Sequence, residues 1–488
     1  MSSEELNIRR IRKGIGWVYP ELRWLSQRQA KSATSKRDKL LKSLSANVKH
    51  SFMGSKIHTG KLSPGCLMCG RGYWSCIFIN ALCTANCFYC PQDRNLEREI
   101  SPYEDIVFEN PRDYISYLEK FNIKGVGFSG GEPLLVFDRL SAYIKEIRER
   151  LGKKIYLWIY TNGALATKNN ITRLKNIGLD EIRFNISANN YDLRPVELAA
   201  GIMDTVTVEI PSIPEDQPIL KKKLIEMQRV GVKHLNLHQL QTSSFSYKSF
   251  IQRGYTFLHQ PDIPVFESEI AALEIIGYAL DKRIALPINY CTSMYKDRFQ
   301  NRGRRWRRGL LVKSDFEELT GSKYIRKLSV QDSPAGIKKI LKAMRENRCR
   351  QGLWALNAAK TEIYIHSSLL KHIDFSKYNL SVSYFKPKLK KALDSEEGAC
   401  EISLSPDKKI FIEKELLARK KFSGEAAIKA FQKLFIKNAS SSKKALNHFY
   451  SNQPLKTKTD LNGFKKEIEN LLSLKKSERL ETGFPKVY

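Results

Sequence analysis

Short apolar runs alternate with amphipathic stretches between about residues 66 and 295 of this 488-residue chain. The runs are rich in β-branched and aromatic residues and stay apolar nearly throughout, which predicts strands buried on both faces. We expect seven strands, at residues 76–82, 125–130, 154–161, 181–187, 205–211, 234–240 and 284–290. The stretches between them have helical patterns, and one of them, at 110–121, begins with Asn110 as N-cap and Pro111 in the first helical position.

Strands that are each followed by a helix are typical of parallel βα units, so the fold class is α/β. Right-handed crossovers of six or seven such units curl into a full or partial barrel, or lie open as a doubly wound sheet. In either arrangement, functional side chains gather at the carboxyl ends of the strands. The ends of the predicted strands are therefore where we look for chemistry.

The regions on either side of this core, which we bound at 65–310, have different patterns. Residues 1–64 are basic and contain one helical stretch at 20–48, which predicts a helical N-terminal extension. Residues 320–488 mix both patterns, which predicts a C-terminal α+β accessory region. Its predicted elements are a helix at 333–346, strands at 361–366 and 380–385, and a hairpin at 400–415.

Composition narrows the class of protein. Hydrophobic residues make up 42% of the chain, yet no apolar run reaches the roughly 18 residues that a membrane span needs, so we expect a soluble, cytoplasmic protein. The net charge of +32 favours polyanionic partners, which include nucleic acid, anionic lipid and phosphorylated substrates. Six of the nine cysteines lie between Cys66 and Cys90, which favours metal ligation in a reducing compartment over disulfides.

Three cysteines follow the first predicted strand in the segment CTANCFYC, as Cys83, Cys87 and Cys90. Three thiolates within eight residues suit a cuboidal iron-sulfur cluster in which one iron has no protein ligand. Zinc would need a fourth ligand, which usually comes from a second, distant pair of residues. The segment therefore predicts a metal centre with an open position at the functional end of the core.

The next two strands also end in short motifs, GFSGGEPLL at 127–135 and YTNG at 160–163. Together with the C-x3-C-x2-C segment, this pattern resembles the radical S-adenosylmethionine (radical SAM) superfamily, in particular the branch of pyruvate formate-lyase activating enzymes. The resemblance covers residues 66–295 and implies a partial (β/α)6 to (β/α)7 barrel. It does not extend to the C-terminal third of the chain.

The resemblance also implies the cofactors and their chemistry. A [4Fe-4S] cluster on the three cysteines would bind the amine and carboxylate of S-adenosylmethionine. An electron from an external low-potential donor would then cleave that molecule and give a 5'-deoxyadenosyl radical, which abstracts hydrogen from the substrate.

By the same resemblance, Tyr89 would lie against the adenine, and the turn after the second strand would hold the methionine amine through Gly130, Gly131 and Glu132. Three further polar residues at strand ends would face the ribose or the carboxylate, and these are Asn185, Ser187 and Glu209. Their other interpretation is that they only satisfy the hydrogen bonds of the strand ends.

A second cysteine group, CLMCGRGYWSC, contains Cys66, Cys69 and Cys76. Cys76 opens the first strand and Cys83 follows its end, and seven extended residues at about 3.3 Å each separate them by about 20 Å. We therefore predict a second metal site, either zinc or iron-sulfur. His58 would complete a zinc set, whereas a cluster would recruit one of the distant cysteines, Cys291, Cys349 or Cys400.

Two further features follow the seventh strand. Cys291 ends it, so this thiol is expected to face the cavity, as a hydrogen-atom donor to a substrate radical, as a ligand of a nearby cluster, or as a buried small hydrophobe. Residues 296–308 carry seven basic side chains and one acid, together with Phe299 and Trp306. Such a segment suits phosphate pairing and base stacking in RNA, and also an acidic protein segment, a phosphorylated small molecule or a solvated surface helix.

Three functional hypotheses follow. The first is a radical SAM enzyme, similar to activating enzymes, that abstracts hydrogen from a macromolecular substrate, either protein or RNA. The second is the same chemistry used to modify RNA by methyl or sulfur transfer. The third is a non-catalytic iron-sulfur protein that binds nucleic acid. Neither the substrate nor the oligomeric state follows from the sequence.

Overall fold

The structure is a computed structural model, and it describes residues 8, 11–12, 15–16, 18–92, 102–103, 106–260, 262–393, 399–436 and 469–484. The chain divides into two compact units. The first ends at Gly303 and also includes residues 403–408 and 482–484. The second contains the described residues of Arg304–Ile402 and Lys409–Glu481.

The first unit contains a nine-stranded sheet with the order β1-β2-β11-β10-β9-β8-β7-β6-β3. Seven neighbouring strands are parallel and follow one another in chain order. They are β3 (Trp74–Asn80), β6 (Gly125–Gly130), β7 (Tyr156–Thr161), β8 (Glu181–Phe184), β9 (Thr205–Pro211), β10 (His234–His238) and β11 (Ile288–Cys291). This arrangement confirms the predicted partial barrel, with seven strands.

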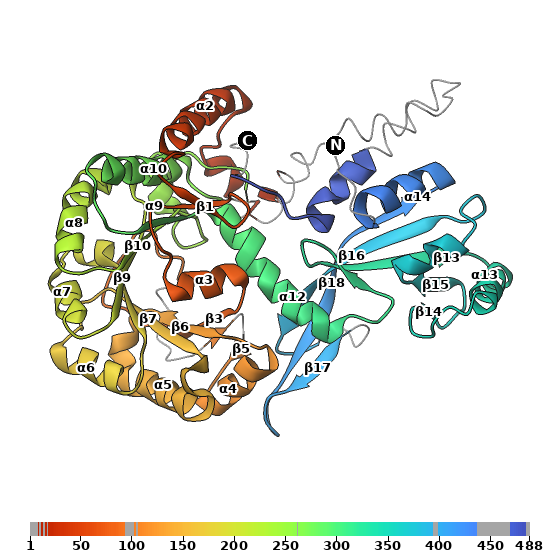
Figure 1. Ribbon diagram of the computed structural model, residues 1–488, viewed down its shortest axis with the longest axis horizontal. Helices are drawn as coiled ribbons and strands as arrows, with labels where there is room; N and C mark the ends of the chain where they lie inside the picture. Colours follow the sequence, from red (N-terminus) through yellow and green to blue (C-terminus); the bar gives the residue numbers. More distant parts are fainter. Residues whose placement is uncertain are drawn as a thin grey trace. The chain divides into compact units, whose positions relative to one another are not determined.

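Helices in the crossovers cover the outer side of this curled sheet (Figure 1). They are α4 (Pro111–Lys120), α5 (Phe137–Leu151), α6 (Lys168–Asn176), α7 (Arg194–Ala200), α8 (Gln217–Arg229) and α10 (Phe266–Asp281). The predicted cap of the first is present, because the Asn110 side chain accepts a hydrogen bond from the Asp113 amide at 3.0 Å. A small sheet of β4 (Pro102–Tyr103) and β5 (Ile106–Val107) lies in the chain between β3 and α4.

Alternation along the strands gives the barrel two different faces. Val126, Ile159 and Val208 have no exposed surface, as expected for side chains that pack between strands and helices. The strand positions that alternate with these outward-facing ones point into the barrel. Several of them carry polar groups that meet there, and Arg183 and Glu209 form one such contact at 2.8 Å. The barrel therefore encloses a charged interior behind an apolar outer layer.

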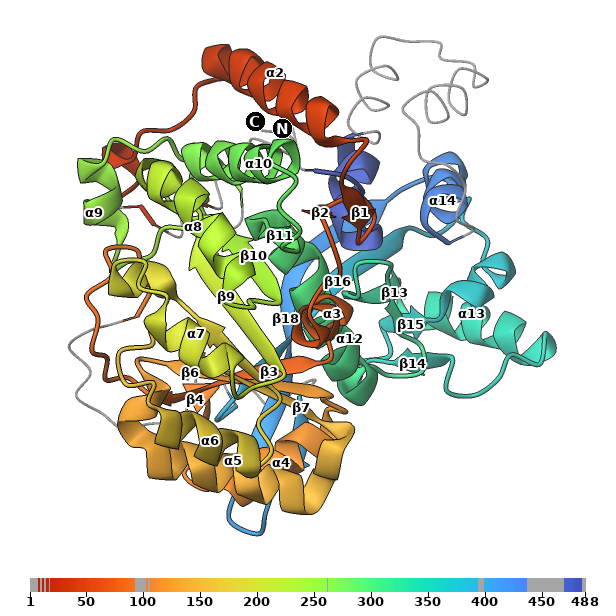
Figure 2. The same ribbon diagram turned by 60° about the vertical axis from the view of Figure 1, so that its left-hand side comes forward.

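The N-terminal segment belongs to the same unit. The predicted helix at 20–48 is present as a short turn at Tyr19–Glu21 and as α2 (Gln27–Leu44), which begins with a capping box between Ser26 and Gln29. Helix α2 packs along α10 (Figure 2), and Arg37 reaches the buried Glu269 at 3.6 Å. Strands β1 (Lys49–Ser51) and β2 (Lys56–His58) extend the sheet beside β11 in antiparallel orientation.

Helix α3 (Pro64–Arg71) lies on the inner side of the curled sheet (Figure 1), where it contacts β3, β6 and β7. It begins with Ser63 as N-cap, which accepts a hydrogen bond from the Cys66 amide at 3.2 Å. Cys66 and Cys69 are therefore carried into the barrel on a short helix.

The second unit contains an antiparallel sheet with the order β14-β15-β13-β16-β18-β17. Its strands are β13 (Ile325–Gln331), β14 (Trp354–Leu356), β15 (Glu362–Ile365), β16 (Leu380–Lys390), β17 (Cys400–Ser403) and β18 (Lys409–Phe422), and β12 (Glu318–Leu319) pairs with β13. Its helices include α13 (Pro334–Glu346) and α14 (Glu425–Phe431). The predicted α+β composition of this region is confirmed.

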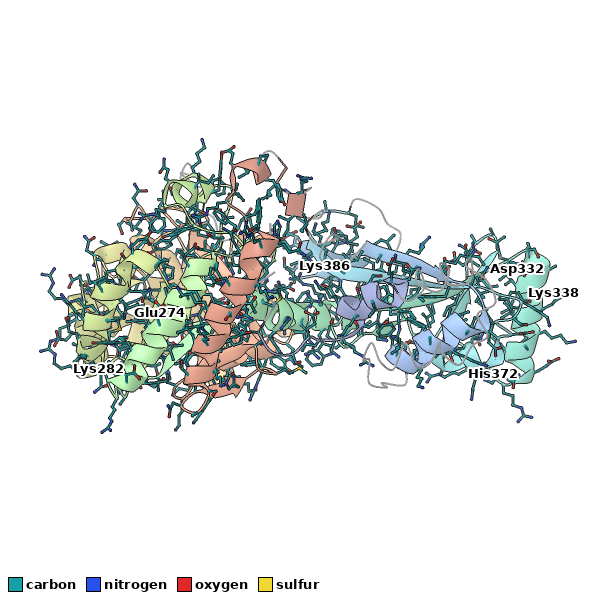
Figure 3. All side chains as sticks on the ribbon, turned by 90° about the horizontal axis from the view of Figure 1, so that it is seen from above. Glu274, Lys282, Asp332, Lys338, His372 and Lys386 are labelled. Carbon is teal, nitrogen blue, oxygen red and sulfur yellow. The ribbon has the colours of Figure 1, made fainter. Side chains whose placement is uncertain are left out.

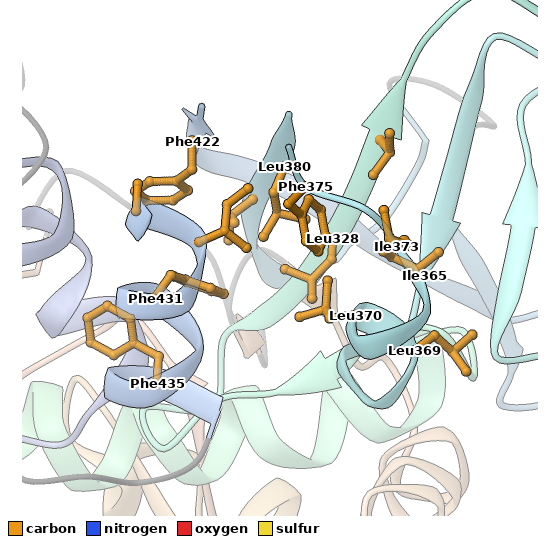
Figure 4. Packing of buried hydrophobic residues seen from close by; sticks show 14 of the residues in the cluster. Leu328, Ile365, Leu369, Leu370, Ile373, Phe375, Leu380, Phe422, Phe431 and Phe435 are labelled. Atoms are coloured by element: carbon orange, nitrogen blue, oxygen red, sulfur yellow. The ribbon is translucent and has the colours of Figure 1, made fainter. Parts of the chain in front are cut away.

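Apolar side chains from both layers form the core of the second unit. Leu328 and Leu380 come from the sheet, and Phe431 and Phe435 pack against them from the C-terminal helical segment (Figure 4). Charged side chains such as Lys338 and Lys386 remain exposed on its surface (Figure 3). The unit thus has a core of its own, which is a requirement for an independently folding region.

Candidate active site

The three clustered cysteines lie on the loop that follows β3, at the carboxyl end of the barrel. All three are free thiols; Cys83 is exposed and Cys87 and Cys90 are half-buried. The loop folds tightly, because the Cys90 amide donates to the Cys87 carbonyl at 3.1 Å. The Ala85 amide points at the Cys83 sulfur at 3.4 Å. The predicted arrangement of three thiols on one short loop is therefore present.

The glycine pair that ends β6 packs directly against the start of this loop. A Cβ atom on Gly130 would lie 2.1 Å from the Asn80 carbonyl oxygen, and one on Gly131 would lie 1.7 Å from that of Leu82. Gly130 also has a positive φ of +118°. Only glycine permits this approach, which lets the Glu132 amide donate to the Leu82 carbonyl at 2.7 Å.

Glu132 connects the turn after β6 with the end of β7. Its carboxylate is 1% exposed and accepts hydrogen bonds from Thr161 Oγ1 at 2.8 Å, the Asn162 amide at 2.8 Å and the Leu134 amide at 3.1 Å. Burial raises the pKa of Glu132, and these hydrogen bonds oppose that rise. Its side chain therefore fixes the shape of the turn.

Asn162, in the YTNG motif, links β7 to the cysteine loop. Its side-chain amide donates to Thr84 Oγ1 at 2.8 Å and lies 3.8 Å from the Cys83 sulfur. The sequence pattern alone assigns Asn162 no role. Its position directly after the buried strand end was the available signal.

The Tyr89 hydroxyl lies beside the side chains of Asn185 and Ser187. Its hydroxyl is 2.7 Å from Ser187 Oγ and 3.3 Å from Asn185 Oδ1, and Ser187 Oγ donates to the same Asn185 oxygen at 2.8 Å. Both partners follow the end of β8. Burial raises the pKa of Tyr89, so the phenol stays protonated at neutral pH. These residues form one polar group beside the cysteine loop.

The aromatic residue before Tyr89 anchors the loop on its other side. The Phe88 ring packs against Phe250 of α9 (Tyr247–Gln252), with ring centroids 5.8 Å apart. The Arg253 guanidinium lies over the Phe88 ring, 3.8 Å from its centroid. Our sequence reasoning gave neither Phe88 nor Arg253 a role, because the contact joins residues that are far apart in the chain.

Glu209 lies in a group of charged and polar side chains. Its carboxylate lies in the barrel interior, where it meets Arg183 Nη1, His238 Nε2 and Asn236 Nδ2, each at 2.8 Å. Burial alone would raise the pKa of Glu209, but Arg183 and His238 bring it below its ordinary value. These contacts match its charge inside the protein, and its contact with the ribose or the carboxylate stays a prediction.

The second cysteine group also differs from the prediction. Cys66 and Cys69 on α3 lie close to Cys291 at the end of β11. The neighbouring sulfurs contribute to the raised pKa values of Cys66 and Cys69. Burial raises the pKa of the Cys69 thiol to about 12. Cys76 lies instead on β3 opposite Gly127, where it acts on the phenol of Tyr160. The third member of the group is therefore Cys291.

His58, the expected fourth ligand for zinc, is buried on β2. Its Nδ1 lies 2.6 Å from the Gly60 carbonyl oxygen and donates a hydrogen bond to it. Among the described residues, no three thiol, imidazole or carboxylate groups are already arranged around a single metal ion.

The basic segment after β11 is largely buried. It forms a turn at Lys296–Gln300 and the start of α12 (Asn301–Val312). Phe299 and four of its arginines are at most 7% exposed, and these are Arg298, Arg305, Arg307 and Arg308. Arg298, for example, donates to the Gly483 carbonyl at 2.7 Å. These buried side chains are not accessible to RNA, whereas Lys296, Arg302 and Arg304 are half-buried, so the RNA-binding interpretation of the segment stays a prediction that only these three basic residues support.

Within the part of the chain that the structure describes, no helix is both long enough and apolar enough to span a membrane.

Comparison with known proteins gives one family match and several relatives. Residues 77–200 match the model of the radical SAM superfamily. A putative glycyl-radical enzyme activating enzyme of Methanocaldococcus jannaschii is 28% identical over 305 residues, which cover 59% of this chain and 78% of that protein. A probable GTP 3',8-cyclase of the same organism is 32% identical over 120 residues, which cover 24% of this chain and 37% of that protein.

Among solved structures, SuiB of Streptococcus suis is similar with a TM-score of 0.31 and 13% identity. The match covers 46% of this chain and 50% of SuiB. This chain therefore spans about half the length of that protein.

Proposed function

Because residues 77–200 belong to the radical SAM superfamily, we propose that this enzyme acts like an activating enzyme and abstracts a hydrogen atom from a protein substrate. The observation that carries the proposal is the convergence of three motifs at neighbouring strand ends. The cysteine loop after β3, the glycine turn after β6 and Asn162 after β7 contact one another directly. Parallel βα folds place their catalytic groups at this end of the sheet.

The loop after β3 fits a [4Fe-4S] cluster held by Cys83, Cys87 and Cys90. Three thiols on one short loop are a suitable donor set, and two N–H groups already point toward the Cys83 sulfur. When bound, the cluster supplies the electron for reductive cleavage of S-adenosylmethionine and so generates the radical that abstracts hydrogen.

The residues of the chain position the cofactor and protect the reaction. In this proposal, the Tyr89 group with Asn185 and Ser187 binds the nucleoside part of S-adenosylmethionine, and the turn at Gly130 and Gly131 binds its amine. Glu132 and Asn162 fix the glycine turn, the end of β7 and the cysteine loop relative to one another, through the hydrogen bonds described above. The packed aromatic residues behind the loop exclude water from one side of a site in which a reactive radical must be protected.

The relative described as a glycyl-radical enzyme activating enzyme supports a protein substrate and an external electron donor. The basic segment of 296–308 gives RNA less support, because four of its six arginines are buried. We therefore keep hydrogen abstraction from a protein as the proposed function.

The first test uses anaerobically reconstituted full-length protein with dithionite and S-adenosylmethionine. We expect 5'-deoxyadenosine, and we expect Cys87→Ala to abolish it while Cys349→Ala, on a thiol of the second unit, retains it. Iron-loaded protein that forms no 5'-deoxyadenosine would refute the radical chemistry.

The second test concerns the substrate. Desalted protein from the native cells should accelerate 5'-deoxyadenosine formation, and protease treatment of that fraction should remove the effect. Acceleration that survives protease but is lost after ribonuclease would transfer the proposal to RNA.

A further inference from the structure

Three thiols from distant parts of the chain meet inside the barrel, away from the loop at Cys83. Cys66 and Cys69 are one helical turn apart on α3, and Cys291 ends the last parallel strand. Cys66 is 5% exposed and Cys291 is 6% exposed. The barrel interior around them is polar and charged, so these are not cysteines in an apolar core.

Each of the three sulfurs has N–H groups directed at it. Lys56 Nζ lies 2.8 Å from the Cys291 sulfur, Asn236 Nδ2 lies 3.3 Å from that of Cys66, and the Gln300 amide contacts that of Cys69. A third side-chain amide, that of Asn289, is near two of the sulfurs. Its nitrogen lies 3.8 Å from the Cys66 sulfur and 3.6 Å from the Cys291 sulfur.

This pattern suits sulfur atoms that become negatively charged when they bind a metal. A neutral thiol is a weak hydrogen-bond acceptor, whereas a thiolate bound to metal accepts N–H donors well, and such donors surround iron-sulfur centres. Two of the amides also have oxygen acceptors, since Asn236 Nδ2 donates to Glu209 at 2.8 Å and Asn289 Nδ2 donates to the Asn236 side-chain oxygen at 2.9 Å. The contacts of Lys56 and Gln300 with sulfur therefore carry most of the argument, and such donors are of the kind that orients and stabilises metal-binding thiolates.

Lys56 strengthens this argument. It has no exposed surface, and a buried ammonium group is costly unless a negative charge or a hydrogen-bond acceptor matches it. Its described contacts are the Cys291 sulfur and the face of the Tyr295 ring, 3.9 Å from the centroid. The nearby carboxylates of Glu181 and Glu209 are paired with Arg183, at 3.0 Å and 2.8 Å. The sulfurs are therefore the groups that match the charge of Lys56.

We propose that Cys66, Cys69 and Cys291 bind a second iron-sulfur cluster inside the barrel, with Lys56 beside it as the balancing cation. This inference goes beyond the proposed function and does not rest on it. Three thiolates leave one corner of a cuboidal cluster open. A structural zinc ion would usually need a fourth protein ligand beside three thiolates, and the ring of His58, the expected fourth ligand, is hydrogen-bonded to the Gly60 carbonyl.

The test removes the first site and measures what remains. The full-length Cys83→Ala/Cys87→Ala/Cys90→Ala variant is reconstituted anaerobically with ferrous iron and sulfide, and its iron, labile sulfide and zinc are counted. We expect about four irons and about four sulfides per chain, visible absorption and, after reduction, an electron paramagnetic resonance signal. Adding Cys66→Ala, Cys69→Ala or Cys291→Ala should each remove most of this iron.

Cys76→Ala in the same background is the matched control, because this thiol is close in sequence to the proposed ligands but lies on β3, opposite Gly127 of β6. It should retain the iron. Circular dichroism and elution volume identify variants that fail to fold, and for these Lys56→Met serves as a second probe. It should keep the cysteine ligands but make the cluster harder to reduce, whereas Lys56→Arg should restore the potential.

Three results would overturn the proposal. The first is a triple variant that folds but contains no iron, and the second is zinc without sulfide at the same site. The third is loss of iron in Cys76→Ala together with full retention in Cys291→Ala. Because none of these measurements uses S-adenosylmethionine, they are independent of the test of the proposed function.

Discussion

The side-chain amide of Asn162 donates a hydrogen bond to the hydroxyl of Thr84 at 2.8 Å, and this contact ties the end of β7 to the middle of the cysteine loop. It joins residues 78 positions apart and lies between two of the motifs that define the site. The loop is therefore held from the side by a neighbouring strand as well as by its own turn.

We expect Asn162→Ala to loosen the loop. Loss of one such hydrogen bond corresponds to about 1 kcal/mol, which is about a fivefold effect on an equilibrium. The expected result is a lower iron content after reconstitution and slower formation of 5'-deoxyadenosine. Asn170→Ala is the control, because it removes an amide-to-carbonyl hydrogen bond to Leu165 that is remote from the loop. Equal losses in both variants would contradict a specific role for Asn162.

Gly131→Ala tests the contact between the turn after β6 and the cysteine loop. Its new methyl group would meet the Leu82 carbonyl at 1.7 Å, so the backbone must move. Such overpacking typically destabilises a protein by about 1–3 kcal/mol, and here it should also displace the loop and reduce iron binding. Gly201→Ala has only ordinary contacts at 3.6 Å and beyond, and should leave stability and iron content nearly unchanged in denaturation and metal assays.

Substitutions of Tyr89 and Ser187 should have coupled effects on the affinity for S-adenosylmethionine. Tyr89→Phe and Ser187→Ala each remove the 2.7 Å hydrogen bond between the two hydroxyl groups. Each should weaken S-adenosylmethionine binding about fivefold, which corresponds to about 1 kcal/mol. The double variant should be weaker than the wild type by less than the product of the single effects, since both remove the same contact. Titration calorimetry on the iron-loaded proteins measures all four affinities, and fully additive effects would argue against a shared hydrogen bond.

Glu209 predicts a dependence of stability on pH. Its pKa is lower in the folded protein than in the unfolded chain, so its stabilising effect is present above about pH 4.3, the ordinary value for glutamate. That effect is lost as the pH falls below this value, because the unfolded chain then binds protons more readily than the folded one. The stability difference between wild type and Glu209→Gln should be largest near neutral pH and should shrink under acid conditions.

Urea denaturation at several pH values checks this expectation. Breaking one partner of a buried ion pair typically costs about 3–5 kcal/mol, so the difference near pH 7 should be easily measured. Glu197→Gln, at an exposed position of α7, is the control and should show little difference at any pH. A difference for Glu209→Gln that stays constant into acid would mean that the pKa of Glu209 is the same in the folded and unfolded states, and would contradict the prediction.

Much of the barrel could be predicted because its information is local. Each parallel strand is a short apolar run, and the polar motifs that follow the strands had to lie on one edge of the sheet, whatever the exact curvature. The grouping of Cys83 with the turn at Gly130 and of Tyr89 with Ser187 followed from this rule. The rule says nothing about which side chain each donor contacts, so Asn162 and Arg253 were missed.

The parts that could not be predicted depend on contacts between distant segments. Cys76 is close to Cys66 in sequence but lies on β3 opposite Gly127, whereas Cys291, at the end of β11, lies close to the helix that carries Cys66 and Cys69. Glu209 was placed at a strand end, and Arg183, from the neighbouring strand, draws it into the interior. The arginines of 296–308 were expected on the surface, because a single sequence does not show which charged helices are covered by other parts of the chain.

The pairing of β2 with β11 also sets an order of assembly during synthesis. The loop from Cys83 to Cys90 closes over only a few residues, so it can form as soon as its own segment has left the ribosome. The contact between Lys56 and Cys291 spans 235 residues and must wait until nearly the whole barrel has been made. Long-range contacts of this kind form late and slowly. A newly made chain therefore passes through a stage in which one group of thiols is ready for metal while the other still lacks its last member.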